Sequence, residues 1–484
     1  MNKKNNLIKN VLILGIGRAS TQLVAILLLP LYTLYLSPGD YGFVDLIITY
    51  IALFVPIITI KLETASFRYL IDARHDETKK KEIISNVLQI ILPILLTCVI
   101  GFIIFTRFIH VPYSELILLN ICIAIFSNIL LQFARGLGEN KRFAIACTLT
   151  GTTTLISAII FVAILRMGAG GLLLAIALAN LVCGVYLFFA LKMSKYIGFK
   201  NRDKALQKSL IKYSYPLIPD SISWWIINIS DRTIVSVAIG LAANGIYAVA
   251  NKYAAIFNSI FSIFGMSWAE SASVHIDSED RDSFFSEIIN ASINLFGSLG
   301  LLLIVYIPLF FNFLISVKFS DSYQYIPILI IAAFLNAISG LYGAIFIAKK
   351  MTKHIAKTSI IAAIVNISIN LVFISFIGIY AAAISTALAY LVMAIYRHHG
   401  VKKYVTITYK NSIFVKMAVL YASVMILYYF NNFIGNILSA IIITVIVILL
   451  NKSIIKVMKD KVLNLSGRRR KKLTVEQEQY EDSI

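Results

Sequence analysis

Charged residues are scarce in this sequence. Only 14% of its 484 residues are Asp, Glu, Lys or Arg, whereas 59% are hydrophobic. A soluble protein of this length needs more polar surface than that. The composition therefore excludes a soluble protein and indicates an integral membrane protein.

The motifs of several function classes are also missing. The four cysteines all fall inside apolar segments, which argues against a disulfide framework and against a metal cluster. Gly15-x-Gly17 follows no strand and has no third glycine, so it predicts no nucleotide site. No polar stretch exceeds about 35 residues, too few for an appended ATPase or glycosyltransferase domain. We therefore expect no catalytic residue, no metal and no cofactor.

What the chain does contain is a long series of apolar segments. A helix of about 20 apolar residues crosses the hydrocarbon of a membrane, and about fourteen such segments occur here. The sequence thus predicts an all-α, polytopic membrane protein of about 14 transmembrane helices. The segments are 11–35, 43–66, 83–106, 114–134, 143–165, 170–191, 215–239, 246–269, 285–311, 323–347, 356–377, 379–396, 411–430 and 433–450.

The placement of the basic residues predicts the topology. Of 44 Lys and Arg residues, 36 fall in alternate loops and in the two termini, and only Arg107, Arg166 and Lys318 fall on the opposite side. This is the positive-inside pattern, so we expect both termini in the cytoplasm. The net charge of +20 therefore indicates membrane topology and not nucleic acid binding. The acidic loop 270–282 fits least well on the cytoplasmic side.

A long basic loop, 192–212, divides the chain into six segments before it and six after it. Because each half starts on the same side, the halves are expected to be parallel repeats. We predict an N-terminal lobe over 1–205, a C-terminal lobe over 206–400 and two further helices over 401–450. Residues 451–484 then form a basic cytoplasmic tail, first amphipathic and then disordered.

Two consecutive segments each carry a polar stripe. In the seventh, side chains four, four and three residues apart share one helical face, with Arg232 at its flank. The members of this stripe are Asp220, Trp224, Asn228 and Asp231. The stripe of the eighth segment consists of Tyr247, Asn251, Asn258 and Ser262, with Lys252 and Ser259 beside it.

Arg18 adds another cation at membrane depth, roughly 10 Å into the first segment. Ionised groups in a bilayer are costly and usually face a protein-lined cavity. Because the cations outnumber Asp231, we predict a cavity that receives an anion. The candidate substrate-binding residues are Arg18, Arg232, Lys252, Asn228, Asn251 and Trp224, and the candidates for ion coupling or cavity tuning are Asp220 and Asp231.

Each of these residues has a structural interpretation as well. Polar side chains in membranes often hydrogen-bond across packed helices, and Asp231 with Lys252 fits a buried ion pair. Arg18 fits a pair with Asp45 or Glu63. We interpret Asp45 and Glu63 themselves as interface residues, because each lies near the end of its segment, where a carboxylate costs little.

Four strings, in order along the chain, resemble the Wzx-type oligosaccharide and polysaccharide flippases. They are Leu28–Gly42 (LLPLYTLYLSPGDYG), Tyr215–Pro219 (YPLIP), Ser230–Arg232 (SDR) and Gly245–Lys252 (GIYAVANK). The resemblance covers roughly residues 10–400. It implies the fold of the multidrug/oligosaccharidyl-lipid/polysaccharide exporter superfamily, with two pseudo-symmetric six-helix lobes around a central cavity plus two C-terminal helices.

The resemblance also implies a function. Members of the family move undecaprenyl-pyrophosphate-linked oligosaccharides across the bacterial cytoplasmic membrane by alternating access, for O-antigen, capsule or exopolysaccharide assembly. We expect a protein that works as a monomer in the bilayer, with a polysaccharide polymerase and a chain-length regulator as candidate partners. A lipid II flippase is the main alternative, and a multidrug antiporter is a weaker one because its cavity should be acidic. A polysaccharide polymerase is disfavoured, since no predicted outer loop exceeds about ten residues.

Overall fold

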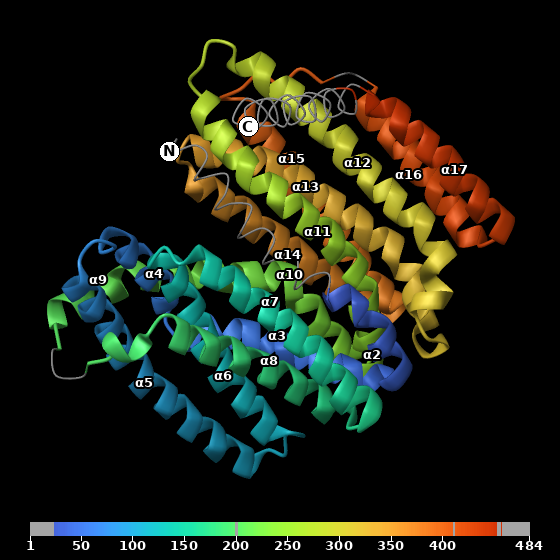
Figure 1. The fold of residues 1–484 in the computed structure, drawn as a ribbon. Coiled ribbons are helices and arrows are strands. Elements are labelled where there is room, and N and C mark those ends of the chain that lie inside the picture. The colour runs from blue at the N-terminus through green and yellow to red at the C-terminus, as the bar shows by residue number, and fades with distance from the viewer. Residues whose placement is uncertain (1–23, 199–201, 410–411, 453–455, 457–484) are drawn as a thin grey trace, which may run out of the picture.

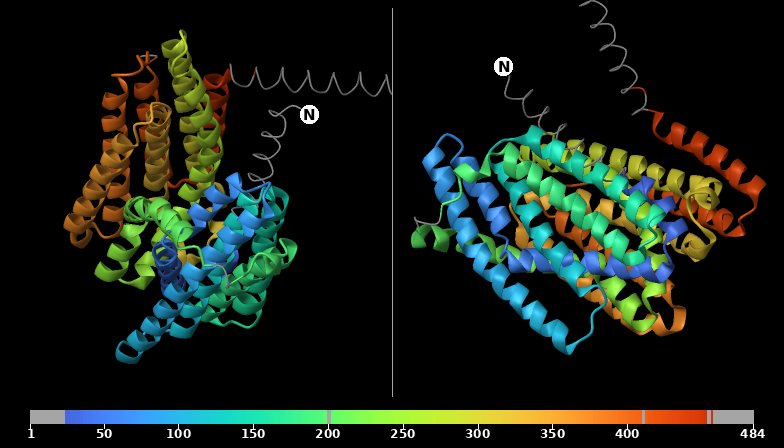
Figure 2. Two further views of the ribbon diagram at one scale, coloured as in Figure 1. Left: turned by 90° about the vertical axis from the view of Figure 1, so that its left-hand side faces the viewer. Right: turned by 60° about the horizontal axis from the view of Figure 1, so that its bottom comes forward.

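The structure is a computed structural model that describes residues 24–198, 202–409, 412–452 and 456, and none of them forms a strand. Its α-helices form two groups, the first bundle (α2–α9) and the second bundle (α10–α17) (Figure 1). In the left view of Figure 2, the yellow, orange and red helices of the second bundle lie above the blue and cyan helices of the first. The prediction of an all-α, polytopic membrane protein is therefore confirmed.

Eleven of the described helices are long and apolar enough to cross a membrane. The eleven omit the predicted first segment, which is described only from residue 24, and the seventh and eighth segments, whose polar stripes lower their hydropathy. The expected number of about 14 transmembrane helices stays a prediction.

The first bundle owes several of its helix boundaries to local capping. The side chain of Ser37 accepts a hydrogen bond from the backbone N–H of Asp40, and Pro38 occupies the first turn, so a helix starts there. Left-handed backbone at Ile60 and Lys61 separates that helix from the next one. The elements are α2 (Leu29–Tyr35), α3 (Pro38–Ile58), α4 (Leu62–Asp72), α5 (Glu77–Phe108), α6 (Ser114–Gly136), α7 (Asn140–Ala158), the π-helical η1 (Ile159–Ile164), α8 (Gly168–Ala190), η2 (Met193–Lys195) and α9 (Lys204–Ser214).

In the second bundle, five helices pack in a ring, each against the next, in the order α10, α14, α15, α13, α11 and back to α10. Helices α16 and α17 pack outside this ring, against α12. The elements are η3 (Tyr215–Leu217), α10 (Ile218–Ala238), α11 (Leu241–His275), α12 (Arg281–Leu314), η4 (Val317–Tyr325), α13 (Ile326–Ala348), α14 (Thr352–Ile377), α15 (Ile379–Val401), α16 (Ile413–Phe430) and α17 (Phe433–Leu450).

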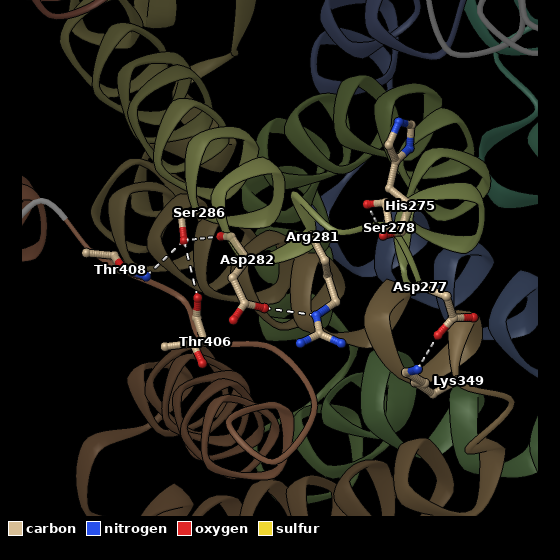
Figure 3. A network of polar contacts seen from close by, with 9 residues as sticks. All are labelled: His275, Asp277, Ser278, Arg281, Asp282, Ser286, Lys349, Thr406 and Thr408. Atoms are coloured by element: carbon tan, nitrogen blue, oxygen red, sulfur yellow. Dashed lines mark hydrogen bonds and ion pairs between the residues drawn. The ribbon is translucent and has the colours of Figure 1, made fainter.

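We call the end with the lysine- and arginine-rich connections the basic end, and the opposite end the outer end. The acidic connection between α11 and α12 lies at the basic end (Figure 3). Lys349 donates a hydrogen bond of 2.7 Å to Asp277, which holds the pKa of that carboxyl below its ordinary value. Arg281 donates to Asp282 at 2.9 Å. Two acids of this unusual loop are therefore balanced by basic residues of the same end.

The bundles meet mainly through α2 and α3 on one side and α10, α11 and α12 on the other. One apolar core crosses this seam at the outer end, where Leu36 and Val44 are buried in the same cluster as Tyr247 and Phe319. Towards the basic end, the first bundle has a separate core that includes Phe133. The seam is thus closed by apolar packing in its outer half.

Candidate functional site

Two charged residues from different bundles form an ion pair inside the seam. Arg232 of α10 places Nη1 3.1 Å from Asp45 Oδ1 and 3.0 Å from Asp45 Oδ2. The same Nη1 donates to Thr49 Oγ1 at 3.1 Å. Because Asp45 and Thr49 are four residues apart on α3, both face α10. Only 8% of the Asp45 side chain and 22% of the Arg232 side chain are exposed, so the pair is largely removed from solvent.

A cavity of about 190 Å³ adjoins this pair. Asp45 and Lys252 both line it, together with Tyr32, Thr150 and Thr154, so its walls come from both bundles. Lys252 interacts electrostatically with Asp45 and with Arg232. Within the described part of the chain, no carboxylate lies within 4.0 Å of the Lys252 ammonium. The cavity is therefore lined by one ammonium group and one carboxylate that are not in direct contact.

Asp231, the neighbour of Arg232, points into the interior of the second bundle. Its carboxylate accepts hydrogen bonds from Tyr247 Oη (3.0 Å) and Asn370 Nδ2 (3.1 Å), and a short one from Thr386 Oγ1. These donors come from α11, α14 and α15. The side-chain oxygen of Asn370, Oδ1, is buried and has no hydrogen-bond partner in the described structure. Asp231 is thus surrounded by hydroxyl and amide side chains. Among the described residues it forms no ion pair with Lys252.

Two of the six predicted substrate-binding side chains lie near Asp45, since Arg232 pairs with its carboxylate and Lys252 lines the same cavity. Asn251 is half-buried beside Lys252, and its amide donates to the Tyr247 carbonyl at 3.2 Å. Arg18 lies outside the described residues. The side chains of Asp220, Trp224 and Asn228 are likewise not described, although their backbone belongs to α10. Their roles stay predictions.

The interpretation of Asp45 as an interface residue stays a prediction, but its helix starts earlier than hydropathy indicates. Hydropathy places the start of its segment at residue 43, whereas the Ser37 cap starts α3 at Pro38. Asp45 consequently lies about 10 Å along the helix, at 1.5 Å per residue. In the described part of the site, Arg232 and Lys252 are accompanied by Asp45 and Asp231, so the expected surplus of cations over acids is smaller than the sequence suggested.

Further polar residues were missed by the sequence analysis. Asn366 and Asn370 lie four residues apart in one apolar segment, a spacing that could have revealed a polar face on α14. Arg397 was assigned to a loop, yet it lies in α15 and is buried. It donates to Thr358 Oγ1, to the Ser339 carbonyl and to Ser359 Oγ at 3.1–3.2 Å.

The arrangement suits binding of an oxyanion better than catalysis. A guanidinium and an ammonium beside one cavity provide several N–H donors, and both interact more strongly with an anion in a low dielectric than in water. No group of three or more His, Cys, Asp or Glu side chains that could hold a metal ion occurs in the described part of the chain.

The comparisons with known proteins agree with this fold. The family model described as "Polysaccharide biosynthesis protein" matches residues 7–269. The structure of the lipid II flippase MurJ in an inward closed conformation is 16% identical, with a TM-score of 0.68, over 92% of this chain and 100% of that one. No curated protein matches the chain.

Two conformations of a multidrug resistance MATE family transporter of the MOP superfamily are also similar. The inward-facing one has a TM-score of 0.66 at 14% identity, over 84% of this chain and 98% of that one. The outward-facing one has a TM-score of 0.56 at 15% identity, over 85% of this chain and 95% of that one. At these identities, the solved structures show a shared membrane-transporter fold.

Proposed function

This chain belongs to the polysaccharide biosynthesis protein family, and we propose that it is a flippase for undecaprenyl-pyrophosphate-linked oligosaccharides. It would move repeat units from the inner to the outer leaflet of a bacterial cytoplasmic membrane, for O-antigen, capsule or exopolysaccharide assembly. The observation that carries the proposal is the placement of Lys252 in the wall of a cavity between the two bundles, whose other charged lining residue, Asp45, pairs with Arg232. Both ends of the chain are expected to face the cytoplasm.

The chemistry of the substrate fits these cations. A pyrophosphate carries several negative oxygens, and the arginine fork binds such groups through paired hydrogen bonds. The sugars would contact the polar residues of α10 and α11, and the polyprenyl chain would stay in lipid. A cavity of about 190 Å³ is small beside the roughly 300–1,000 Å³ of ordinary ligand pockets. The bundles must therefore move apart to admit the head group, as alternating access requires.

Asp231 is the described residue best placed to couple transport to an ion. A buried carboxylate that can bind a proton or a small cation is typical of coupling sites in membranes. Oxygen atoms of Thr386 and Asn370 lie beside it, and the unpaired Asn370 carbonyl oxygen is a further acceptor for a cation. Hard cations prefer such oxygen ligands. We therefore propose that Asp231 takes up a proton or a sodium ion during the cycle.

The two alternatives differ in the substrate that they require. A lipid II flippase would use the same cations, because lipid II also carries a pyrophosphate. A multidrug antiporter for cationic drugs would be hindered by Arg232 and Lys252. A comparison of transport of the three substrates therefore separates the three functions.

The experiment uses the purified protein in proteoliposomes. Flipping of the lipids is followed as accessibility of the glycan to an added glycosidase, and transport of the dye is followed by its fluorescence. The arms contain an undecaprenyl-pyrophosphate-linked oligosaccharide, lipid II, or a cationic dye. Arg232→Gln and Lys252→Gln should each abolish flipping of the first lipid. The matched control is Lys416→Gln, because Lys416 is an exposed cation on α16, away from the cavity. Full flipping by both cavity variants, or transport of the dye alone, would refute the proposal.

A further inference from the structure

The outer half of the seam contains a set of links between the two bundles. The Asn244 amide donates to the Gly42 carbonyl at 2.8 Å, and the Ser316 N–H donates to Thr33 Oγ1 at 3.3 Å. Trp225 Nε1 donates to the Thr49 carbonyl at 2.9 Å, nearer the middle of the helices. All hydrogen bonds found between the bundles in the described part of the chain involve α2 or α3. In this conformation the outer end is closed.

Among these links, only the one made by Asp45 joins opposite charges. Asp45 Oδ1 receives the hydrogen bond from Arg232, whereas Asp45 Oδ2 is buried and receives no well-aligned hydrogen bond from any described residue. This oxygen has only the ion-pair contact with Arg232, 3.0 Å away, and a buried carboxylate oxygen without a well-aligned donor is costly. Asp45 also lines the cavity that Lys252 lines. Its carboxylate is thus an incompletely bonded anion at the edge of a cavity that an ammonium group also lines.

We propose that Asp45 is the resident counter-ion of the substrate site, and that the pyrophosphate of the substrate displaces it. This inference rests on the proposed function, because it assigns a pyrophosphate to the cavity. Displacement would free Arg232 from α3 and so remove the ionic link that holds α3 against α10. Opening of the outer end would then follow binding of the anionic head group.

The position of α10 makes opening of the outer end depend on a bound anion. Asp231 fixes α10 to α11, α14 and α15 through its three hydrogen-bond donors, so Arg232 is presented to α3 from a well-anchored helix. Without an anion, separation of the bundles would leave both Arg232 and Asp45 unpaired in a low dielectric, which opposes opening. With a pyrophosphate bound, Arg232 keeps a partner, and the opposition is reduced.

The test measures exposure of the outer seam in lipid nanodiscs. Ala243 is buried at the third position of α11, so a cysteine introduced there, in a background without other cysteines, should react slowly with a polar maleimide. Asp45→Asn keeps the size of the side chain and removes its charge. Asp40→Asn is the matched control, since Asp40 lies on the same helix and, among the described residues, its side chain hydrogen-bonds only to its N-cap residue Ser37.

We expect Asp45→Asn to raise the labelling rate about tenfold without any lipid, because a charge-assisted hydrogen bond is lost. Asp40→Asn should label as slowly as the unchanged protein. Undecaprenyl pyrophosphate should accelerate labelling of the unchanged protein, uncharged undecaprenol should not, and Asp45→Asn should show no further acceleration. If Asp45→Asn does not assemble, Arg232→Gln breaks the same link from α10 and should also label fast.

The outcomes separate this inference from the proposed function. Slow labelling of Asp45→Asn and of Arg232→Gln would overturn the closing role of Asp45, even if flipping is intact. Equal acceleration by both lipids would overturn displacement by the anionic head group. A third outcome is fast labelling of Asp45→Asn together with no effect of either lipid on labelling of the unchanged protein. This outcome would refute the pyrophosphate as ligand but would still support the closing role of Asp45.

Discussion

The outer seam depends on two glycines that allow the backbones of α3 and α11 to touch. Gly42 and Gly245 are each the fifth residue of their helix. A methyl carbon on Gly42 would overlap the Leu241 carbonyl oxygen and would lie 2.6 Å from the Gly245 nitrogen. These are backbone atoms, so the clash cannot be relieved by a change of rotamer. We therefore predict that Gly42→Ala opens the outer end.

The magnitude follows from where the clash exists. Overpacking a tight contact typically costs about 1–3 kcal/mol. Here the cost falls only on the closed conformation, because the added methyl group meets no backbone atoms once α3 and α11 have separated. A bias of about 1–3 kcal/mol changes a two-state equilibrium by roughly 5–150-fold. Gly42→Ala should consequently shift the population towards an open outer end by at least about fivefold.

Spin labels at two exposed outer positions, Met167 of the first bundle and Val317 of the second, would measure this shift as a distance distribution. Gly42→Ala should lengthen the distance between the labels. Gly39→Ala is the control on the same helix, since the nearest atom to its added methyl carbon lies at 3.8 Å. An unchanged distribution for Gly42→Ala, together with unchanged thermal stability, would refute the close approach of the two helices and the reasoning built on it.

Three other changes test the surrounding structure. Thr386→Val removes a hydrogen bond to Asp231 and should lower the free energy of unfolding by about 1–3 kcal/mol. It should also abolish any response of flipping to sodium or proton gradients. Unaltered thermal melting and gradient response would contradict the hydrogen bonding described for Asp231. Arg397→Leu removes three hydrogen bonds and should lower stability by about 1–3 kcal/mol in thermal melting. Melting at the original temperature would show that these bonds contribute little. Asp277→Asn should leave the melting temperature near pH 7 unchanged, because its partner Lys349 holds it in an exposed ion pair. Since that pairing lowers the folded-state pKa of Asp277, any contribution is present above the unfolded pKa and is lost as pH falls through the folded one, so a difference in melting temperature that grew as the pH fell would contradict this pairing.

The polar stripes on α10 and α11 were visible in the sequence because ionised residues are so rare within apolar segments. In the structure Lys252 lines a cavity together with Asp45, and Arg232 pairs with Asp45, while their roles in substrate binding stay predictions. Hydropathy misplaced the start of the helix that carries Asp45 because it reads Ser37–Asp40 as a loop, whereas the serine cap and the proline after it start a helix. It failed at Arg397 for the same reason at a helix end, since α15 continues to Val401.

The partners of Asp231 could not be predicted from periodicity. Asn370 and Thr386 follow it by 139 and 155 residues, and only the ring of helices in the second bundle brings them to the carboxylate. Sequence spacing describes one helix face at a time, so it indicates that a residue faces a neighbour without identifying that neighbour. The interpretation of Asp231 as the partner of Lys252 arose from this limit, because the two stripes were matched by charge alone.

The adjacency of Asp231 and Arg232 has a mechanical consequence for α10. Consecutive residues of an α-helix point about 100° apart. One side chain therefore enters the second bundle while the other reaches across the seam to α3. A rotation of α10 that withdrew Asp231 from Tyr247 and Thr386 would also displace Arg232 from Asp45 and Thr49. Conversely, a bound anion that held Arg232 in a new position would alter the hydrogen bonds of Asp231. Two sites that share one rigid helix in this way must influence each other in both directions, because coupling between binding sites is reciprocal.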